Sequence, residues 1–238
     1  MIISIVNYLM KSLSIFLQIF AIAALIFSTV SLIGLDSAPA VAFQSNFDCL
    51  KSAGYSFANV RAFSLEGIDL DLSVKDTLIY AKRAGLKTEL FIRPCRGKSA
   101  KLQIDAVVLV IANQYYDRFW LFLEDNPNPG CTWGNDHKAN CDYVKEMLAQ
   151  LKYFQTPAGI QTSDRFYRQI FGSQGCDLSQ YPLIYSHNDA SPSFDDYTAF
   201  GGWSAPYGKV FQNNVTLCNL TISKVYEKEF KSSNLLIE

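Results

Sequence analysis

A regular alternation between two hydrophobic patterns constrains the fold of this chain more than any other feature. From Leu32 to Ile170, five short apolar segments with strand character alternate with five segments whose apolar residues recur at helical spacing. The helical patterns then stop, and we expect three short strands at 181–187, 209–212 and 220–226. The sequence therefore predicts an α/β fold, an irregular TIM-like (β/α) barrel with five βα units and then three short strands.

One of the expected helices covers residues 100–115. Residues 100–115 are apolar at helical spacing, with Leu102, Ala106, Leu109 and Val110 in the pattern. We therefore expect a helix over the whole of this range.

Composition and charge exclude two broad classes of protein. Apolar residues make up 49% of the 238 residues and charged residues 18%, which suffices for a substantial core and argues against a disordered chain. The formal net charge is −1, whereas a nucleic-acid binder usually shows a basic face. We therefore expect one large domain or two small ones, and no nucleic-acid partner.

The first 33 residues differ from the rest of the chain. Lys11 precedes an apolar run that ends in the small residues 28–31, which predicts a secretory signal peptide at 1–31. Met10 could be its true start. The alternative is a signal anchor, because Leu13–Ile33 is just long enough to span a bilayer. Cleavage is favoured, since no basic stop-transfer flank follows the run.

The remaining chain is expected to form a single domain at 32–228 with a polar tail at 229–238. Cleavage would release it from the membrane. We therefore expect a secreted monomer, located outside the cell or in a lysosomal or phagosomal lumen.

Six cysteines fit an oxidising compartment, because an even number in a secreted chain indicates disulfides. Cys131 and Cys141 flank a Gly/Asn/Asp-rich segment and are the first choice for a local bridge. A bridge between Cys49 and Cys218 would join the start of the fold to its end. No CxxC or HxxxH spacing occurs, so no zinc or other metal site is expected.

The apolar run that begins at Phe119 ends abruptly in Glu124 and Asp125. Side chains alternate along a strand, so Trp120, Phe122 and Glu124 share one face. In a parallel barrel, the carboxyl ends of the strands form the rim where ligands bind. Glu124 is therefore a candidate site residue. The alternative is that it is the first solvated residue after a core strand.

Asp36 ends the first expected strand in the same way and would lie on the same rim as Glu124. Two carboxyl groups suit the hydrolysis of glycosidic bonds, in which one donates a proton and the other stabilises a positive charge. His187 follows a later expected strand and could line the mouth, although a structural histidine is the alternative. Motifs for serine hydrolases, P-loops and dinucleotide binding are absent from the sequence.

Eight short segments in this order form a recognisable series: GLD at 34–36, FDCL at 47–50, GYSFA at 54–58, VRA at 60–62, WLFLE at 120–124, FGS at 171–173, PLIY at 182–185 and FGGWSAP at 200–206. The series resembles the glycoside hydrolase family 25 lysozymes of the Chalaropsis type, in the form found in protists and nematodes. It spreads over most of the mature chain, and the last segment is its most specific part.

The resemblance implies five βα units followed by three strands, and cleavage of the β-1,4 bond after N-acetylmuramic acid in peptidoglycan. It implies no cofactor, a bacterial cell-wall glycan as partner, Glu124 as proton donor and Asp36 as the first rim aspartate. The residues that we expect to contact the glycan are Phe122, Trp120, Tyr185, His187 and Trp203.

Two positions depart from the family pattern. Phe122 and Ser223 stand where the family has aspartates, and Lys209-Val210-Phe211 replaces a K-Q-Y segment. Asp125 does not substitute for the first aspartate, because neighbouring residues of a strand point to opposite faces. The sequence thus supports a lysozyme, with two alternatives: a lysozyme-like protein that binds glycan without hydrolysing it, or a barrel with no glycan function.

Overall fold

The computed structural model describes residues 32–38, 42–63 and 69–228, and only the backbone for most of 32–38. The expected signal peptide at 1–31 and the tail at 229–238 lie outside these residues. Within them, no helix combines the length and the apolar character needed to cross a bilayer.

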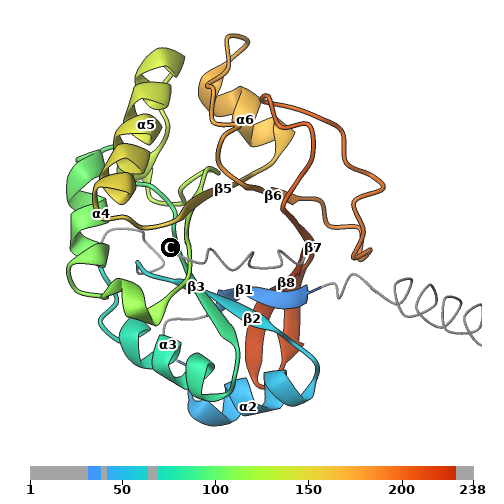
Figure 1. Cartoon of the computed structure of the whole chain (residues 1–238). Helices are drawn as coiled ribbons and strands as arrows, with labels where there is room; N and C mark the ends of the chain where they lie inside the picture. The colour runs from blue at the N-terminus through green and yellow to red at the C-terminus, as the bar shows by residue number, and fades with distance from the viewer. Residues whose placement is uncertain (1–31, 39–41, 64–68, 229–238) are drawn as a thin grey trace, which may run out of the picture. The chain divides into compact units, whose positions relative to one another are not determined.

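The described elements follow the predicted order along the chain (Figure 1). The strands are β1 (Leu32–Ala38), β2 (Phe57–Arg61), β3 (Lys87–Ile92), β4 (Phe119–Phe122), β5 (Ala158–Thr162), β6 (Leu183–Ser186), β7 (Gly208–Leu217) and β8 (Leu220–Glu227). The helices are α2 (Gln44–Ser52), α3 (Val74–Arg83), α4 (Ala100–Val108), α5 (His137–Tyr153) and α6 (Asp164–Phe171), with short 3₁₀ helices at Asn113–Tyr115 and Pro129–Cys131.

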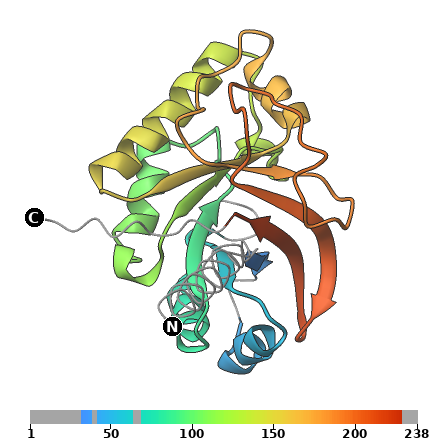
Figure 2. The same cartoon turned by 45° about the vertical axis from the view of Figure 1, so that its right-hand side comes forward.

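The eight strands form a closed barrel in sequence order. Strands β1 to β7 are parallel to their neighbours, whereas β8 runs antiparallel to both β7 and β1. The five helices lie outside the barrel from α2 round to α6, and loop rather than helix accompanies β7 (Figures 1 and 2). The predicted irregular barrel of five βα units and three strands is therefore confirmed.

Two details of the prediction are wrong. β7, expected at 209–212, has 10 residues, because its outer half extends into the hairpin with β8 and has mostly exposed side chains, whereas β8 matches its expected range within one residue. The helix expected at 100–115 ends at Val108. Leu102 and Leu109 are exposed, while Ile104 and Val107 form the buried side of α4.

Two glycines make room for large rings inside the barrel. A Cβ on Gly34 would lie 2.2 Å from the ring of Phe57, and a Cβ on Gly159 would lie 2.2 Å from the ring of Trp120. These separations are far below van der Waals contact. The glycines on β1 and β5 thus let aromatic side chains from β2 and β4 fill the interior.

The cysteines form three disulfides, Cys49–Cys218, Cys95–Cys131 and Cys141–Cys176. The expected Cys49–Cys218 bridge is confirmed, and the expected Cys131–Cys141 bridge is wrong. Although Cys131 and Cys141 are near in sequence, the first faces the loop after β3 and the second faces the loop after α6.

We expect removal of the Cys49–Cys218 bridge by alanine substitution at both positions to lower the free energy of unfolding by about 3–5 kcal/mol. The bridge joins residues separated by 169 positions, so it restricts the unfolded chain strongly. Removal of Cys141–Cys176, separated by 35 positions, should cost about 1 kcal/mol less. Urea unfolding of the two variants tests the order, and the reverse order would contradict it.

Candidate active site

Strands β3 and β4 carry three facing pairs of side chains inside the barrel. From the amino to the carboxyl ends of the strands, the pairs are a hydrogen bond from Trp120 to Glu89 at 2.5 Å, a ring stack of Phe91 and Phe122 with centroids 4.2 Å apart, and an ion pair of Arg93 with Glu124 at 3.3 Å. Trp120, Phe122 and Glu124 therefore share a face, as the alternation along the strand predicts. The aromatic pair forms the floor beneath the ion pair.

The rim above this floor is charged. Arg61 ends β2, while Arg93 and Glu124 follow β3 and β4, so the three residues come from adjacent strands. Phe57, Asn59 and Arg61 lie on the same face of β2, because side chains alternate along a strand. Since Phe57 packs among the buried side chains inside the barrel, Arg61 is on the inward face of the strand. Trp133, from the loop after β4, donates its indole N–H to the backbone oxygen of Glu124 at 2.8 Å. The loop thus holds the backbone at Glu124 in place.

The carboxyl of Glu124 is in a setting that favours its protonated form. Its side chain is 21% exposed. Burial raises its pKa and outweighs the attraction of Arg93, which lowers it, while Asp125 raises it slightly. A carboxyl of this kind can hold a proton at a higher pH than a solvated glutamate and then donate it.

Asp36 belongs to β1, and its backbone pairs with Ser223 of β8. Its side chain lies outside the part of the chain that the structure describes. The separation of its carboxyl from that of Glu124, which would distinguish the modes of glycoside hydrolysis, therefore stays a prediction.

Four of the five expected glycan contacts are buried: Tyr185, which lines a cleft, and three others. Trp120 is 0% exposed and Phe122 is 3% exposed, and both lie in the barrel interior. Trp203 is also buried, packs against Tyr167 and Phe200, and donates its indole N–H to a backbone oxygen. None of the three presents a ring face to the surface, so the structure gives no support to their role as stacking platforms.

Tyr185 and His187 line a cleft of about 250 Å³ at the carboxyl ends of β5 and β6. The cleft also takes in Ser163 and Asp196, and β5 and β6 follow β4 around the barrel. Tyr185 is buried and belongs to the larger of the two clusters of buried apolar side chains, whereas the His187 side chain is 57% exposed. Of the expected glycan contacts, these two therefore adjoin open space.

The acid Asp196 organises the polar groups of this cleft. It accepts hydrogen bonds from Tyr185 at 2.8 Å and from Lys209 at 2.7 Å, and His187 Nδ1 lies 2.5 Å from it. Lys209 also donates to Asp189 at 2.7 Å. Burial raises the pKa of Asp196, but these hydrogen bonds outweigh burial and hold it well below its usual range.

Ligand atoms of His187, Asp189 and Asp196 lie within 4.8 Å of one another, a spacing that a metal ion could use. The ammonium of Lys209, whose side chain is fully buried, already bonds to both carboxylates. We assign no metal here, because the lysine supplies the compensating positive charge.

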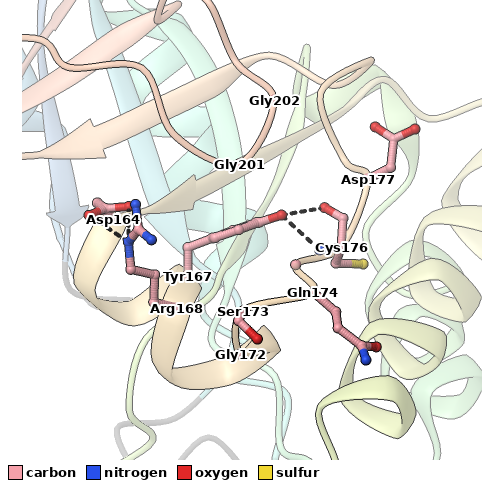
Figure 3. A pocket seen from close by; sticks show the side chains of 11 residues that line it. Asp164, Tyr167, Arg168, Gly172, Ser173, Gln174, Cys176, Asp177, Gly201 and Gly202 are labelled. Atoms are coloured by element: carbon pink, nitrogen blue, oxygen red, sulfur yellow. Dashed lines mark hydrogen bonds and ion pairs between the residues drawn. The ribbon is translucent and has the colours of Figure 1, made fainter.

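A larger cavity of about 430 Å³ lies beside α6 (Figure 3). Its walls are α6, the loop 172–177 and Gly201–Gly202. The polar groups there are engaged with one another: Arg168 binds Asp164, and the Tyr167 hydroxyl bonds to the backbone of Cys176 (Figure 3). Nothing in this arrangement resembles the acid at the rim.

Comparison with known proteins decides the family. The profile of the family described as Lysozyme-like protein 1 matches residues 29–211. A probable GH family 25 lysozyme 2 from Dictyostelium discoideum is 30% identical over 216 residues, covering 89% of this chain and 96% of the relative. The chain belongs to the glycoside hydrolase family 25 lysozymes. Lysozyme-like protein 7 from Caenorhabditis elegans is 27% identical, covering 76% of this chain and 66% of that protein.

Two solved lysozyme structures share the fold. The bacterial lysozyme from Streptomyces coelicolor superposes with a TM-score of 0.66 at 15% identity, covering 87% of this chain and 96% of that one. A family GH25 lysozyme from Aspergillus fumigatus gives a TM-score of 0.63 at 16% identity, covering 84% and 95%. At such identity the likeness concerns the fold alone.

Sequence reasoning missed three side chains at the rim of this family 25 barrel, Arg61, Arg93 and Trp133. Arg93 follows a strand as Glu124 does, so the rule that selected Glu124 would also have selected Arg93. Trp133 carries no such signal, because its contact depends on how the loop after β4 folds back.

Proposed function

We propose that this protein is a secreted lysozyme that hydrolyses the β-1,4 bond between N-acetylmuramic acid and N-acetylglucosamine in bacterial peptidoglycan, with Glu124 as general acid. The observation that carries the proposal is the setting of Glu124. Its carboxyl lies at the barrel rim and its pKa is raised by burial. Cleavage of a glycosidic bond requires a proton donor of this kind at the leaving oxygen.

Asp36 is the partner that we propose for Glu124. It lies two residues before the carboxyl end of β1, and from the rim its carboxylate would stabilise the positive charge or orient the substrate's N-acetyl group. The glycan would lie across the rim, with His187 and Tyr185 in the cleft beside it. Neither role requires a metal or an organic cofactor.

A lysozyme-like protein that binds glycan without hydrolysis is the second candidate. Phe122 stacks on Phe91 within the barrel, so its position offers no carboxylate to the transition state. Ser223, opposite Asp36, offers none either. Loss of such an electrostatic partner can cost on the order of a hundredfold or more in rate.

We also propose that residues 1–31 are a signal peptide and that 32–228 form one secreted, monomeric domain. Three disulfides support this part of the proposal, because disulfides form in oxidising compartments.

The test uses protein expressed through a secretory pathway and incubated with purified peptidoglycan. Fragments are reduced with borohydride and then hydrolysed to their sugars. We expect muramitol and not glucosaminitol, because cleavage after N-acetylmuramic acid leaves that sugar as the new reducing end. Binding to cell walls without release would favour the second candidate, and the absence of both binding and release would contradict the two together.

A further inference from the structure

The rim beside Glu124 carries positive charge that the proposed hydrolysis does not use. Arg61 ends β2 and Arg93 directly follows the adjacent strand β3. Burial lowers the pKa of Arg61 and the guanidinium of Arg93 lowers it further, while Asp71 raises it. The described ends of β2, β3 and β4 therefore carry two guanidinium groups and one carboxyl, Glu124, and the carboxylate of Asp71 also acts on Arg61.

The guanidinium of Arg93 can donate further hydrogen bonds. Its contact with Glu124, at 3.3 Å, is longer than the 2.7–2.9 Å usual for a charge-assisted hydrogen bond. Its Nε is buried and has no hydrogen-bond partner among the described residues. A buried N–H without a partner is unfavourable, so an incoming acceptor would gain from meeting it.

We propose that Arg93, with Arg61 beside it, binds a free carboxylate on the sugar that occupies the rim. Guanidinium groups bind carboxylates through two parallel N–H donors, which a single lysine cannot offer. This inference rests on the proposed function, because the same rim must hold the glycan. It names the preferred substrate as an amino sugar that carries a carboxylate.

Two parts of peptidoglycan could supply that carboxylate. Hydrolysis of the amide between muramic acid and its stem peptide exposes the lactyl carboxylate, and the stem peptide has carboxylates of its own. If the lactyl group is the ligand, an amidase reaction must precede the action of this protein.

Binding of the carboxylate would also prepare the acid. The ligand and Glu124 compete for Arg93, so an occupied Arg93 attracts Glu124 less. Burial then dominates, the pKa of Glu124 rises further, and the carboxyl takes up a proton. Substrate binding and protonation of Glu124 are thereby coupled.

Calorimetry with N-acetylmuramic acid and its methyl ester tests this directly, because the two differ in charge. We expect the acid to bind about 10- to 100-fold more tightly than the ester. Arg93→Gln should abolish that preference, and Arg93→Lys should retain part of it. Arg168→Gln, which changes an arginine that pairs with Asp164 on α6, should keep the full preference.

The coupling has its own measurement. Binding heats in buffers with different ionisation enthalpies should reveal proton uptake by the parent protein. Glu124→Gln should bind the acid at least as tightly as the parent and take up no proton. Equal binding of acid and ester by the parent would overturn the carboxylate site, even if peptidoglycan is hydrolysed normally.

The source of the carboxylate is resolved with polymers. Amidase-treated glycan strands, intact peptidoglycan and chitin are compared as ligands for parent and Arg93→Gln. Preference for treated strands would assign the lactyl group, and preference for intact peptidoglycan would assign the stem peptide. An Arg93-dependent preference without any bond cleavage would support the site while contradicting the proposed hydrolysis.

Discussion

Replacement of Glu124 by glutamine is expected to lower kcat on peptidoglycan by about 100- to 10,000-fold, the usual contribution of a general acid. Glutamine has nearly the same shape, and its oxygen can still accept from Arg93, so the fold and the rim should persist. What is lost is the proton for the leaving oxygen. Release of reducing ends over time measures the rate, and thermal unfolding checks that the variant is folded.

Asp125→Asn is the matched control for this prediction. Asp125 is the next residue, but its exposed carboxylate accepts from Gln169 at 2.7 Å and points away from the barrel interior. Its loss should change kcat by less than about twofold, as for most surface substitutions. Equal losses in the two variants would mean that general disturbance of the loop, and not proton donation, explains the effect.

The order of strands and helices could be predicted because each depends on local periodicity. α5 begins at His137 and is buried along Tyr143, Val144 and Met147, as the apolar spacing indicates. The predicted helix at 100–115 is too long, because Leu109 and Val110 continue the apolar pattern after the helix has ended. The local pattern of apolar residues cannot show that the chain leaves the helix at this point.

The site was predictable only in part. Alternation along β4 identified the face of Trp120, Phe122 and Glu124, but it could not distinguish a ring buried at the barrel centre from one at the mouth. Cys131 and Cys141 were paired by nearness in sequence, although disulfide partners are set by the folded loops. The contacts of Trp133 and Asp196 likewise come from long loops, whose paths the sequence pattern does not determine.

We expect a second large effect, on the stability of the fold, from Glu89 and Glu227, which are both buried inside the barrel. Arg118 and Lys87 both act electrostatically on the two carboxyls, Arg118 more strongly, and Arg118 lies over the rings of Trp120 and Tyr207 at 5.3 and 4.6 Å. Burial raises the pKa of Glu89 to about 7 despite the opposing influence of Arg118. Burial and the neighbouring Glu89 raise the pKa of Glu227 well above its usual value.

These raised pKa values fix the direction in which stability depends on pH. In the unfolded chain a glutamate ionises near 4.5, whereas folded Glu89 keeps its proton up to about pH 7. The folded state therefore binds more protons between these values, and stability falls as pH rises through this range. For Glu89 the loss amounts to roughly 3 kcal/mol. The protein should thus be most stable under mildly acidic conditions.

Arg118→Met tests the buried pair, because methionine fills similar space without charge. We expect the free energy of unfolding to fall by about 3 kcal/mol near pH 7.5, where Glu89 is above its pKa of about 7 and needs a counter-charge, and by half of that or less near pH 4.5, where the raised pKa values keep both carboxyls protonated. Arg96→Met is the control, since Arg96 lies 4.8 Å over the ring of Tyr143 and donates to the amide oxygen of Asn140 rather than to a carboxylate. Its cost should be small and independent of pH. Urea unfolding of the parent and the two variants at both pH values gives the change in the free energy of unfolding for each variant at each pH. If Arg118→Met lowers this free energy equally at the two pH values, the buried carboxyls do not depend on this arginine.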